Sequence, residues 1–133
     1  MSESITFSKI LHYDTLKSGI TVGVSLRYKD QSIDCEAKID TGSSHSIFKR
    51  DQGELLGIEI ESVEPVRIST VTGSFFAFPH WIEVEVSGIR TETLMLFAAE
   101  DTFTRNVLGR IGWFDRVKLG LIDYEGKLYL DAY

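Results

Sequence analysis

Alternation of apolar and polar residues is the feature that most restricts how this chain can fold. Between residues 20 and 28 every second side chain is apolar, and the same alternation returns from 33 to 39 after a polar turn at 29–31. Successive side chains of a β-strand point to opposite faces of a sheet, so this pattern is typical of half-buried strands. The two runs therefore predict a hairpin with one face in the core.

The same signal predicts further short strands along the chain. Residues 81–86 alternate, and residues 91–98 are apolar on both faces in their second half, which indicates a central strand. Residues 117–122 and 127–130 predict a last hairpin, while only 49–56 and 110–116 could be helical. Many short strands separated by turns are typical of small closed or folded-over β structures. We therefore expect an all-β fold with one or two short helices.

Composition narrows the expected class of protein. A length of 133 residues fits a single domain spanning 1–133, and the formal net charge of -6 disfavours a nucleic-acid partner. The longest apolar run, Leu94–Ala99, is too short to cross a bilayer, and the N-terminus lacks the pattern of a secretory signal. The single cysteine, Cys35, lies on the apolar face of a predicted strand and is expected to be a small buried hydrophobe. We therefore expect a cytoplasmic protein that does not enter membranes.

A candidate catalytic aspartate follows the second predicted strand. Ile39 leads directly into Asp40-Thr41-Gly42-Ser43-Ser44, and a second strand-like piece follows at 45–48. The glycine permits a tight turn, and the hydroxyl and backbone N–H groups around it can hold a carboxylate. The tripeptide alone also fits an ordinary hairpin turn. The apolar strands on both sides favour an aspartate presented outward from a sheet.

A second motif, Asn106-Val107-Leu108-Gly109-Arg110, lies late in the chain and leads into the possible helix. Together with Ala37–Ser44 it resembles the signatures of the retropepsin family, the retroviral-type aspartic proteases. The likeness extends in order over about 20–130, and Gly109–Arg116 is most similar to the single-domain bacterial members. The resemblance implies a small closed acid-protease barrel with one half-site per chain. It also implies a homodimer that hydrolyses peptide or protein substrates without a cofactor or metal.

The resemblance also implies roles for individual residues. Asp40 of each chain would be catalytic, Thr41 would brace the two loops across the dimer, and the backbone of Gly42 would contact the substrate. Ser43 and Ser44 would support this loop. The second motif would pack beneath the loop through Val107, Leu108, Gly109 and Arg110.

A flap that closes over a bound peptide is expected in a hairpin over 71–78 with its tip at Thr72-Gly73-Ser74. This flap has one glycine and the bulky pair Phe75-Phe76, so we expect it to be stiff. The aromatic residues Phe75, Phe76, Phe78 and Trp81 fit either core and dimer packing or a wall for peptide side chains. The flap candidates are Val71, Thr72, Gly73, Ser74 and Phe75.

Two positions depart from the viral pattern. Ser44 stands where viral enzymes often have a second aspartate, which leaves Arg110 without its usual partner. Ser43 stands where many viral members have alanine. A hydroxyl that donates to a pair of carboxylates lowers the pKa of the pair, so Ser43 predicts an acidic pH optimum.

The chemistry of paired carboxylates agrees with this interpretation. Two carboxylates a few ångströms apart share one proton, so one can activate a water while the other polarises a carbonyl. The chain has no second Asp-Thr-Gly or Asp-Ser-Gly, so the pair requires two chains. His45 and His80 match no zinc spacing with Asp40, and no metal is expected.

Two questions stay open from the sequence. The alternative function is a catalytically silent domain of the same fold, which binds an extended peptide or mediates oligomerisation. The C-terminal residues 128–133 fit either pairing across a dimer or folding back onto their own chain.

Overall fold

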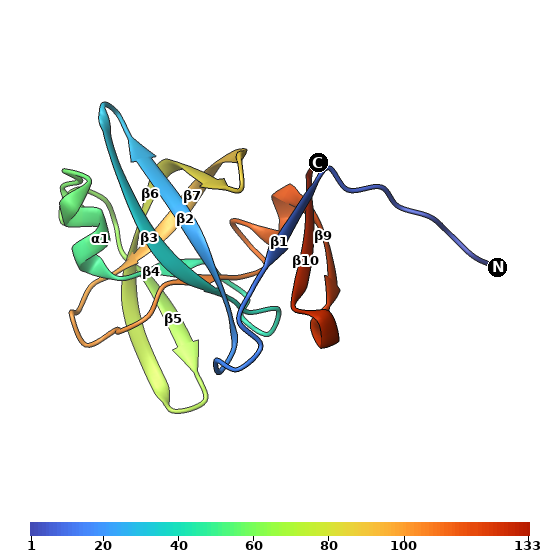
Figure 1. The fold of residues 1–133 in the computed structure, drawn as a ribbon. Helices are drawn as coiled ribbons and strands as arrows, with labels where there is room; N and C mark the ends of the chain where they lie inside the picture. Colours follow the sequence, from blue (N-terminus) through green and yellow to red (C-terminus); the bar gives the residue numbers. More distant parts are fainter.

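The computed structural model describes residues 1–133 and arranges them in two β-sheets with little helix (Figure 1). No helix is long and apolar enough to cross a membrane. The helical segments are α1 (Arg50–Leu55) and the short 3-10 turns η1 (Ile60–Ser62), η2 (Phe114–Arg116) and η3 (Asp123–Glu125). The strands are β1 (Lys9–His12), β2 (Ile20–Tyr28), β3 (Gln31–Ile39), β4 (Ile47–Phe48), β5 (Val66–Thr70), β6 (Gly73–Val86), β7 (Ile89–Ala98), β8 (Val107–Leu108), β9 (Val117–Ile122) and β10 (Lys127–Ala132).

The larger sheet closes on itself. Its seven strands follow the order β2-β3-β8-β4-β7-β6-β5, and β2 also pairs with β6 through Leu26 opposite Val84. This extra pairing joins β2, at one edge of the sheet, to β6, the strand next to the other edge. The sheet therefore becomes a small barrel, and β5 is attached outside the ring. The expectation of an all-β, closed architecture is confirmed.

Every second side chain of the barrel strand β2 points into the core, as the alternation of apolar and polar residues predicted. On β2, Val22, Val24 and Leu26 are buried, whereas Gly23 and Arg27 on the opposite face are exposed. The predicted central strand is also confirmed, because β7 lies between β4 and β6 and its last four residues, 95–98, are buried on both faces. The helix expected over 49–56 forms as α1.

The hairpin expected over 71–78 is wrong in its boundaries. Its arms are β5 and β6, and Thr70 pairs with Gly73 across a two-residue turn at Val71 and Thr72. The strand β6 then continues without a break through Pro79. Proline is tolerated there because β5 ends opposite Ala77, so the strand edge away from β7 has no partner at Pro79.

The helix expected over 110–116 is also wrong. Only η2, at its end, is helical, and the residues before it follow an irregular path. Gly112 has a φ of +104°, outside the helical region, and Trp113 has a φ of -144°. Trp113 is buried in the main core, so tertiary packing determines the path of this segment.

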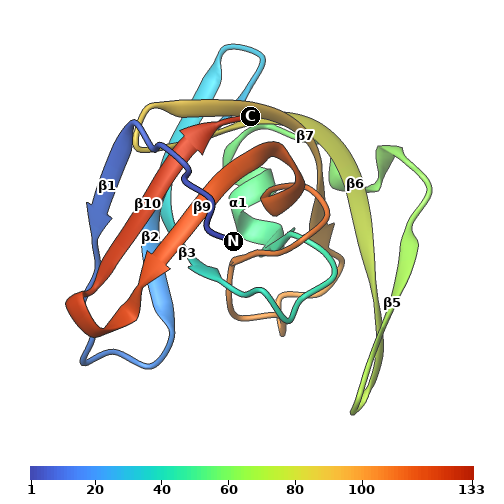
Figure 2. The ribbon, with the colours of Figure 1, turned by 90° about the vertical axis from the view of Figure 1, so that its right-hand side faces the viewer.

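The three-stranded sheet settles the path of the C-terminal residues. It has the order β1-β10-β9, with β10 in the middle, and Figure 2 shows it in front of the barrel. The C-terminal strand therefore folds back onto its own chain. The strand β1, which sequence patterning did not predict, pairs Lys9 with Leu130. Residues before Phe7 extend away from the body of the protein (Figure 1).

Candidate active site

Asp40 lies where β3 ends, beside the parallel strand β8. The backbone N–H of Asp40 donates to the carbonyl of Leu108 at 3.0 Å, which continues the β3–β8 pairing by one residue. The N–H of Gly42 donates to Asp40 Oδ1 at 2.9 Å, and the N–H of Ser43 donates to the Asp40 carbonyl at 3.1 Å. These bonds close a tight turn that holds the carboxylate in one orientation while leaving Asp40 exposed. We call residues 40–44 the Asp40 loop.

The second motif packs directly beneath the Asp40 loop. The carbonyl of Ser43 accepts a hydrogen bond from the N–H of Arg110, and that of Ser44 accepts one from Ile111, both at 2.9 Å. A Cβ atom added to Gly109 would lie 2.2 Å from the carbonyl oxygen of His45 and 2.8 Å from that of Ser43. Only glycine allows the two segments to approach this closely.

Two buried polar residues to which the sequence assigned no role support this arrangement. Ser46 is 2% exposed, and its Oγ accepts a hydrogen bond from the N–H of Gly109 at 3.0 Å. Asn106 is 7% exposed; its Nδ2 donates to the Glu36 carbonyl, and its Oδ1 accepts from the N–H of Lys49, both at 2.9 Å. Buried polar groups need such partners. The sequence signal that could have revealed them is a polar residue immediately before the apolar pair of a short strand: Ser46 precedes β4, and Asn106 precedes β8.

The hydroxyl of Ser43 does not act as the sequence suggested. Its Oγ donates to the carbonyl of His45 at 2.7 Å rather than to the carboxylate of Asp40. The basis on which Ser43 predicted an acidic pH optimum is therefore absent in this chain. Arg110 is exposed beside Ser44, Ile111, Phe114 and Asp115, and its guanidinium forms none of the ion pairs in the chain.

A cleft of about 450 Å³ opens beside Asp40. The hairpin of β5 and β6 projects from the barrel (Figures 1 and 2), and its residues 68–71 and Phe75 line one side of this cleft. Phe75 faces Phe103 from the opposite segment, with ring centroids 5.2 Å apart. The remaining lining residues are Asp40, Gly42, Ser43, Ser44, His45, Ile47, Arg105 and Val107.

Seven of the fourteen sequence-predicted site residues line the cleft: Asp40, Gly42, Ser43, Ser44, Val71, Phe75 and Val107. Thr41 is exposed in the loop without lining the cleft, and Leu108 is fully buried in the core beneath it. In the flap, Val71 is fully exposed at the turn, and Thr72, Gly73 and Ser74 are exposed beyond the cleft. Seven cleft residues had no predicted role: His45, Ile47, Ile68, Ser69, Thr70, Phe103 and Arg105.

The four aromatic residues at 75, 76, 78 and 81 do not share one role: one fits a wall of the cleft, and another fits packing in the core. Phe75 lines the cleft, whereas Phe78 packs against the main core. Phe76 and Trp81 are exposed. His80 does not approach Asp40, because it is buried with its Nε2 2.8 Å from the Ile60 carbonyl oxygen.

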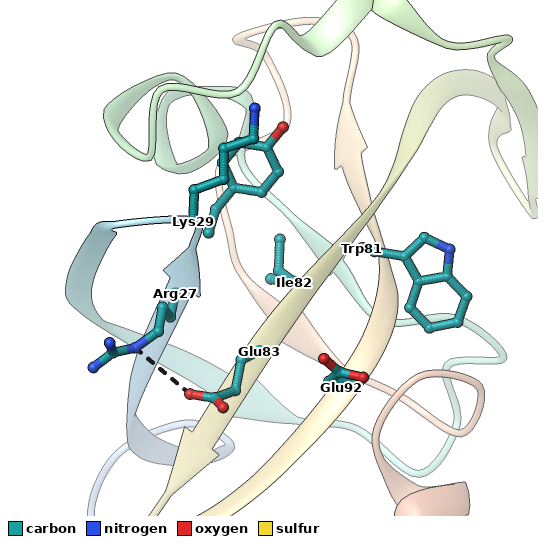
Figure 3. Close-up of a pocket in the computed structure, with 7 residues that line it drawn as sticks. Arg27, Lys29, Trp81, Ile82, Glu83 and Glu92 are labelled. Carbon is teal, nitrogen blue, oxygen red and sulfur yellow. Dashed lines mark ion pairs between the residues drawn. The ribbon is translucent and has the colours of Figure 1, made fainter.

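A second hollow, of about 440 Å³, is lined by Trp81 but by no residue of the Asp40 loop, the second motif or the flap (Figure 3). Its polar groups are partly neutralised by the ion pair between Arg27 and Glu83, at 3.6 Å. In Figure 3, Lys29 lies on one side of β6 and Trp81 projects away from the other side, so these two side chains do not converge on one point. The cleft beside Asp40 is the better candidate for an active site.

Comparison with solved structures identifies the fold. The EIAV protease complexed with the inhibitor HBY-793 superposes with a TM-score of 0.56 and is 23% identical in sequence. The match covers 71% of this chain and 85% of the EIAV chain. No family model matches the sequence, and no curated protein matches it. The chain thus has an all-β, retropepsin-like fold.

Proposed function

We propose that this chain is an aspartic endopeptidase that works as a homodimer, with Asp40 from each protomer forming the catalytic pair. The observation that carries the proposal is the position of the Asp40 carboxylate. It lines the cleft, is held by the Gly42 N–H at 2.9 Å, and is exposed at the surface of the chain. The retroviral protease fold supports the same conclusion.

The proposed mechanism uses the two carboxylates and a water. One ionised carboxylate of the pair removes a proton from the water, while the protonated partner donates a hydrogen bond to the scissile carbonyl. The water adds to the carbonyl carbon to form a tetrahedral intermediate. Protonation of the amine nitrogen then lets the C–N bond break. Each carboxylate changes its protonation state during the cycle, so no other acid or base is needed.

The finer assignments belong to the same proposal. Thr41 braces the two Asp40 loops across the two-fold axis, the Gly42 backbone contacts the peptide, and the β5–β6 hairpin acts as the flap. Residues 1–133 form one protease domain related to the single-domain bacterial members. We also propose the cytoplasm as its location, which the single free cysteine supports because free thiols fit a reducing compartment.

The test is cleavage of a peptide library by wild-type protein and by Asp40→Asn at several protein concentrations. We expect Asp40→Asn to lose at least about a hundredfold in kcat/KM, because it removes the group that activates water. Specific activity of the wild type should rise with protein concentration. Asp30→Asn, which makes the same change in the exposed turn after β2, is the matched control and should retain activity.

One observation favours the silent peptide-binding domain as a second candidate. The Phe75–Phe103 wall and the overhanging hairpin offer an extended peptide a binding surface whether or not Asp40 is paired. Equal activity in wild type and Asp40→Asn would exclude the Asp40 mechanism. A folded dimer that binds library peptides but cleaves none would establish the silent domain instead.

A further inference from the structure

The cleft contains a positively charged side chain, Arg105, that the proposed chemistry does not use. Arg105 is the only arginine or lysine among the lining residues, and Asp40 is the only acid. Arg105 is exposed and takes part in none of the ion pairs of the chain. The chain has a net charge of -6, so acidic side chains outnumber basic ones. A basic side chain in the cleft that pairs with none of these acids is therefore opposite in sign to the net charge of the chain.

The backbone around Arg105 is fixed rather than loose. Its neighbour Asn106 is buried, and the Asn106 side chain bonds to the Glu36 carbonyl and to the Lys49 N–H, both at 2.9 Å. The Asn106 carbonyl also accepts a hydrogen bond from the N–H of Lys38 at 2.9 Å. Arg105 stands two residues before Val107, and both line the cleft. The backbone from which the Arg105 side chain extends is therefore held at a defined place on the cleft wall.

The surroundings of Arg105 add to its positive potential. On its other side, Arg105 borders a hollow that is also lined by Lys38, Lys49 and Glu36. Lys49 lies 3.9 Å from Asp51, so part of its charge is neutralised. The other charged groups that line this hollow are two cations, Lys38 and Arg105, and one carboxylate, Glu36, so positive charge is in excess. A negatively charged group at this end of the cleft would be attracted by the cations around it.

The register of β8 gives the distance scale. Val107 pairs with Lys38, and the N–H of Asp40 bonds to Leu108, so Asp40 lies level with Gly109. Arg105 is four residues before Gly109, which corresponds to about 13 Å along a strand. An extended peptide covers that distance in about four residues.

Resting on the proposed function, we propose that Arg105 selects peptide substrates with an acidic side chain within about four residues of the scissile bond. The apolar wall of Phe75 and Phe103 takes a bulky apolar side chain nearer to that bond. In a two-fold dimer each cleft end carries its own Arg105, so acidic residues are favoured on both sides. The substrate class is an extended peptide with an apolar centre and acidic flanks.

The test uses matched peptides with the same apolar centre and Glu, Gln or Lys at one flanking position at a time. For the wild type we expect kcat/KM to be about five- to tenfold higher with Glu than with Lys at the best position, and the preference to shrink as salt is raised. Arg105→Glu should reverse the order, so that Lys exceeds Glu. Lys17→Glu makes the same charge change in an exposed loop and should keep the wild-type order.

Each result decides the inference separately from the proposed function. Cleavage with no charge preference, or with the same preference in Arg105→Glu, would overturn the role of Arg105 and leave the protease in place. If the wild type cleaves nothing, the affinity of Asp40→Asn for the same peptides decides the inference. Tighter binding of Glu than Lys peptides, reversed by Arg105→Glu, then supports it as a property of a binding domain. Equal or absent binding rejects it.

Discussion

Gly109 lies at a position of the chain where no side chain can be accommodated. A Cβ atom there would lie 2.2 Å from the His45 carbonyl oxygen and 2.8 Å from that of Ser43. Gly109→Ala should therefore push the Asp40 loop away from β8 and lower the free energy of unfolding by about 3 kcal/mol. Urea unfolding of the variant measures this loss.

Gly23 is the matched control for Gly109. It lies on the exposed face of β2, and a Cβ atom there would meet nothing within 4 Å. Gly23→Ala should leave stability unchanged or raise it by about 0.5 kcal/mol, because glycine is costly in a strand interior. Equal losses for the two variants would contradict the steric explanation.

The Cys35 thiol provides a prediction about pH. Burial, followed by the negative charge of Asp34, raises the pKa of Cys35 to about 11 from 9.0. A raised pKa means that the folded state favours the neutral thiol, so this stabilisation is complete below pH 9.0 and is lost as the pH rises towards about 11. In urea titrations, wild type should lose about 2 kcal/mol more than Cys35→Ala over that interval. Parallel pH curves for the two proteins would refute the assignment.

At the residue scale, the sequence predicted positions better than partners. The strand before Asp40 and the glycine after it indicated where the carboxylate would stand, because both are local backbone properties. The predicted hydrogen-bond acceptor of the Ser43 hydroxyl was wrong. Whether Ser43 Oγ donates to the His45 carbonyl or to a carboxylate depends on distances that are determined only in the folded loop. Arg105 was missed because its place in the cleft depends on the pairing of β8 with β3.

At the scale of elements, the hairpin of β6 and β7 offers a simple test. Ser87 and Gly88 connect the strands, with φ values of +51° and +81°. Asparagine adopts this left-handed conformation more readily than serine, and Asn-Gly is a favoured pair in such turns. Ser87→Asn should raise the unfolding free energy by about 0.5 kcal/mol. Gly88→Ala should lower it by about 1 kcal/mol.

Thermal unfolding of both turn variants checks the prediction. The two substitutions lie in the same turn and face solvent, so changes in packing contribute little. A decrease in melting temperature for Ser87→Asn would show that the turn conformation differs from the one described.

Among the elements, strands with clean alternation were predicted and those without it were not. β2, β3 and β7 carry enough apolar side chains to reveal their faces. β1 has four residues and none of them is fully buried, so it forms because β10 offers it an edge. The expected helix at 110–116 failed because burial of Trp113 and the conformation of Gly112 outweigh local helical preference.

At the scale of the whole molecule, the proposal requires two copies. One chain supplies one exposed Asp40, so activity should depend on the dimer. Mixing wild type with an equal amount of Asp40→Asn should reduce activity to about one quarter of that of wild-type protein at the same total concentration, because random pairing leaves one dimer in four with both aspartates. Mixing with Asp30→Asn should leave activity unchanged.

Sedimentation equilibrium provides the matching physical measurement. The average mass should rise from 15.0 kDa towards twice that value over the concentration range in which activity appears. Mixed samples that keep half of the activity would mean that each chain acts alone, which contradicts a shared pair of aspartates.

The middle position of β10 has a consequence for how the protein is made. Lys9, near one end of the chain, pairs with Leu130, near the other, and β9 pairs with the opposite edge of the same strand. The terminal sheet therefore cannot assemble on the ribosome until β10 has been synthesised and has emerged. Such distant contacts slow folding. Until β10 arrives, the nascent chain exposes the strand edges of β1 and β9, which makes this interval the period when aggregation is most favoured.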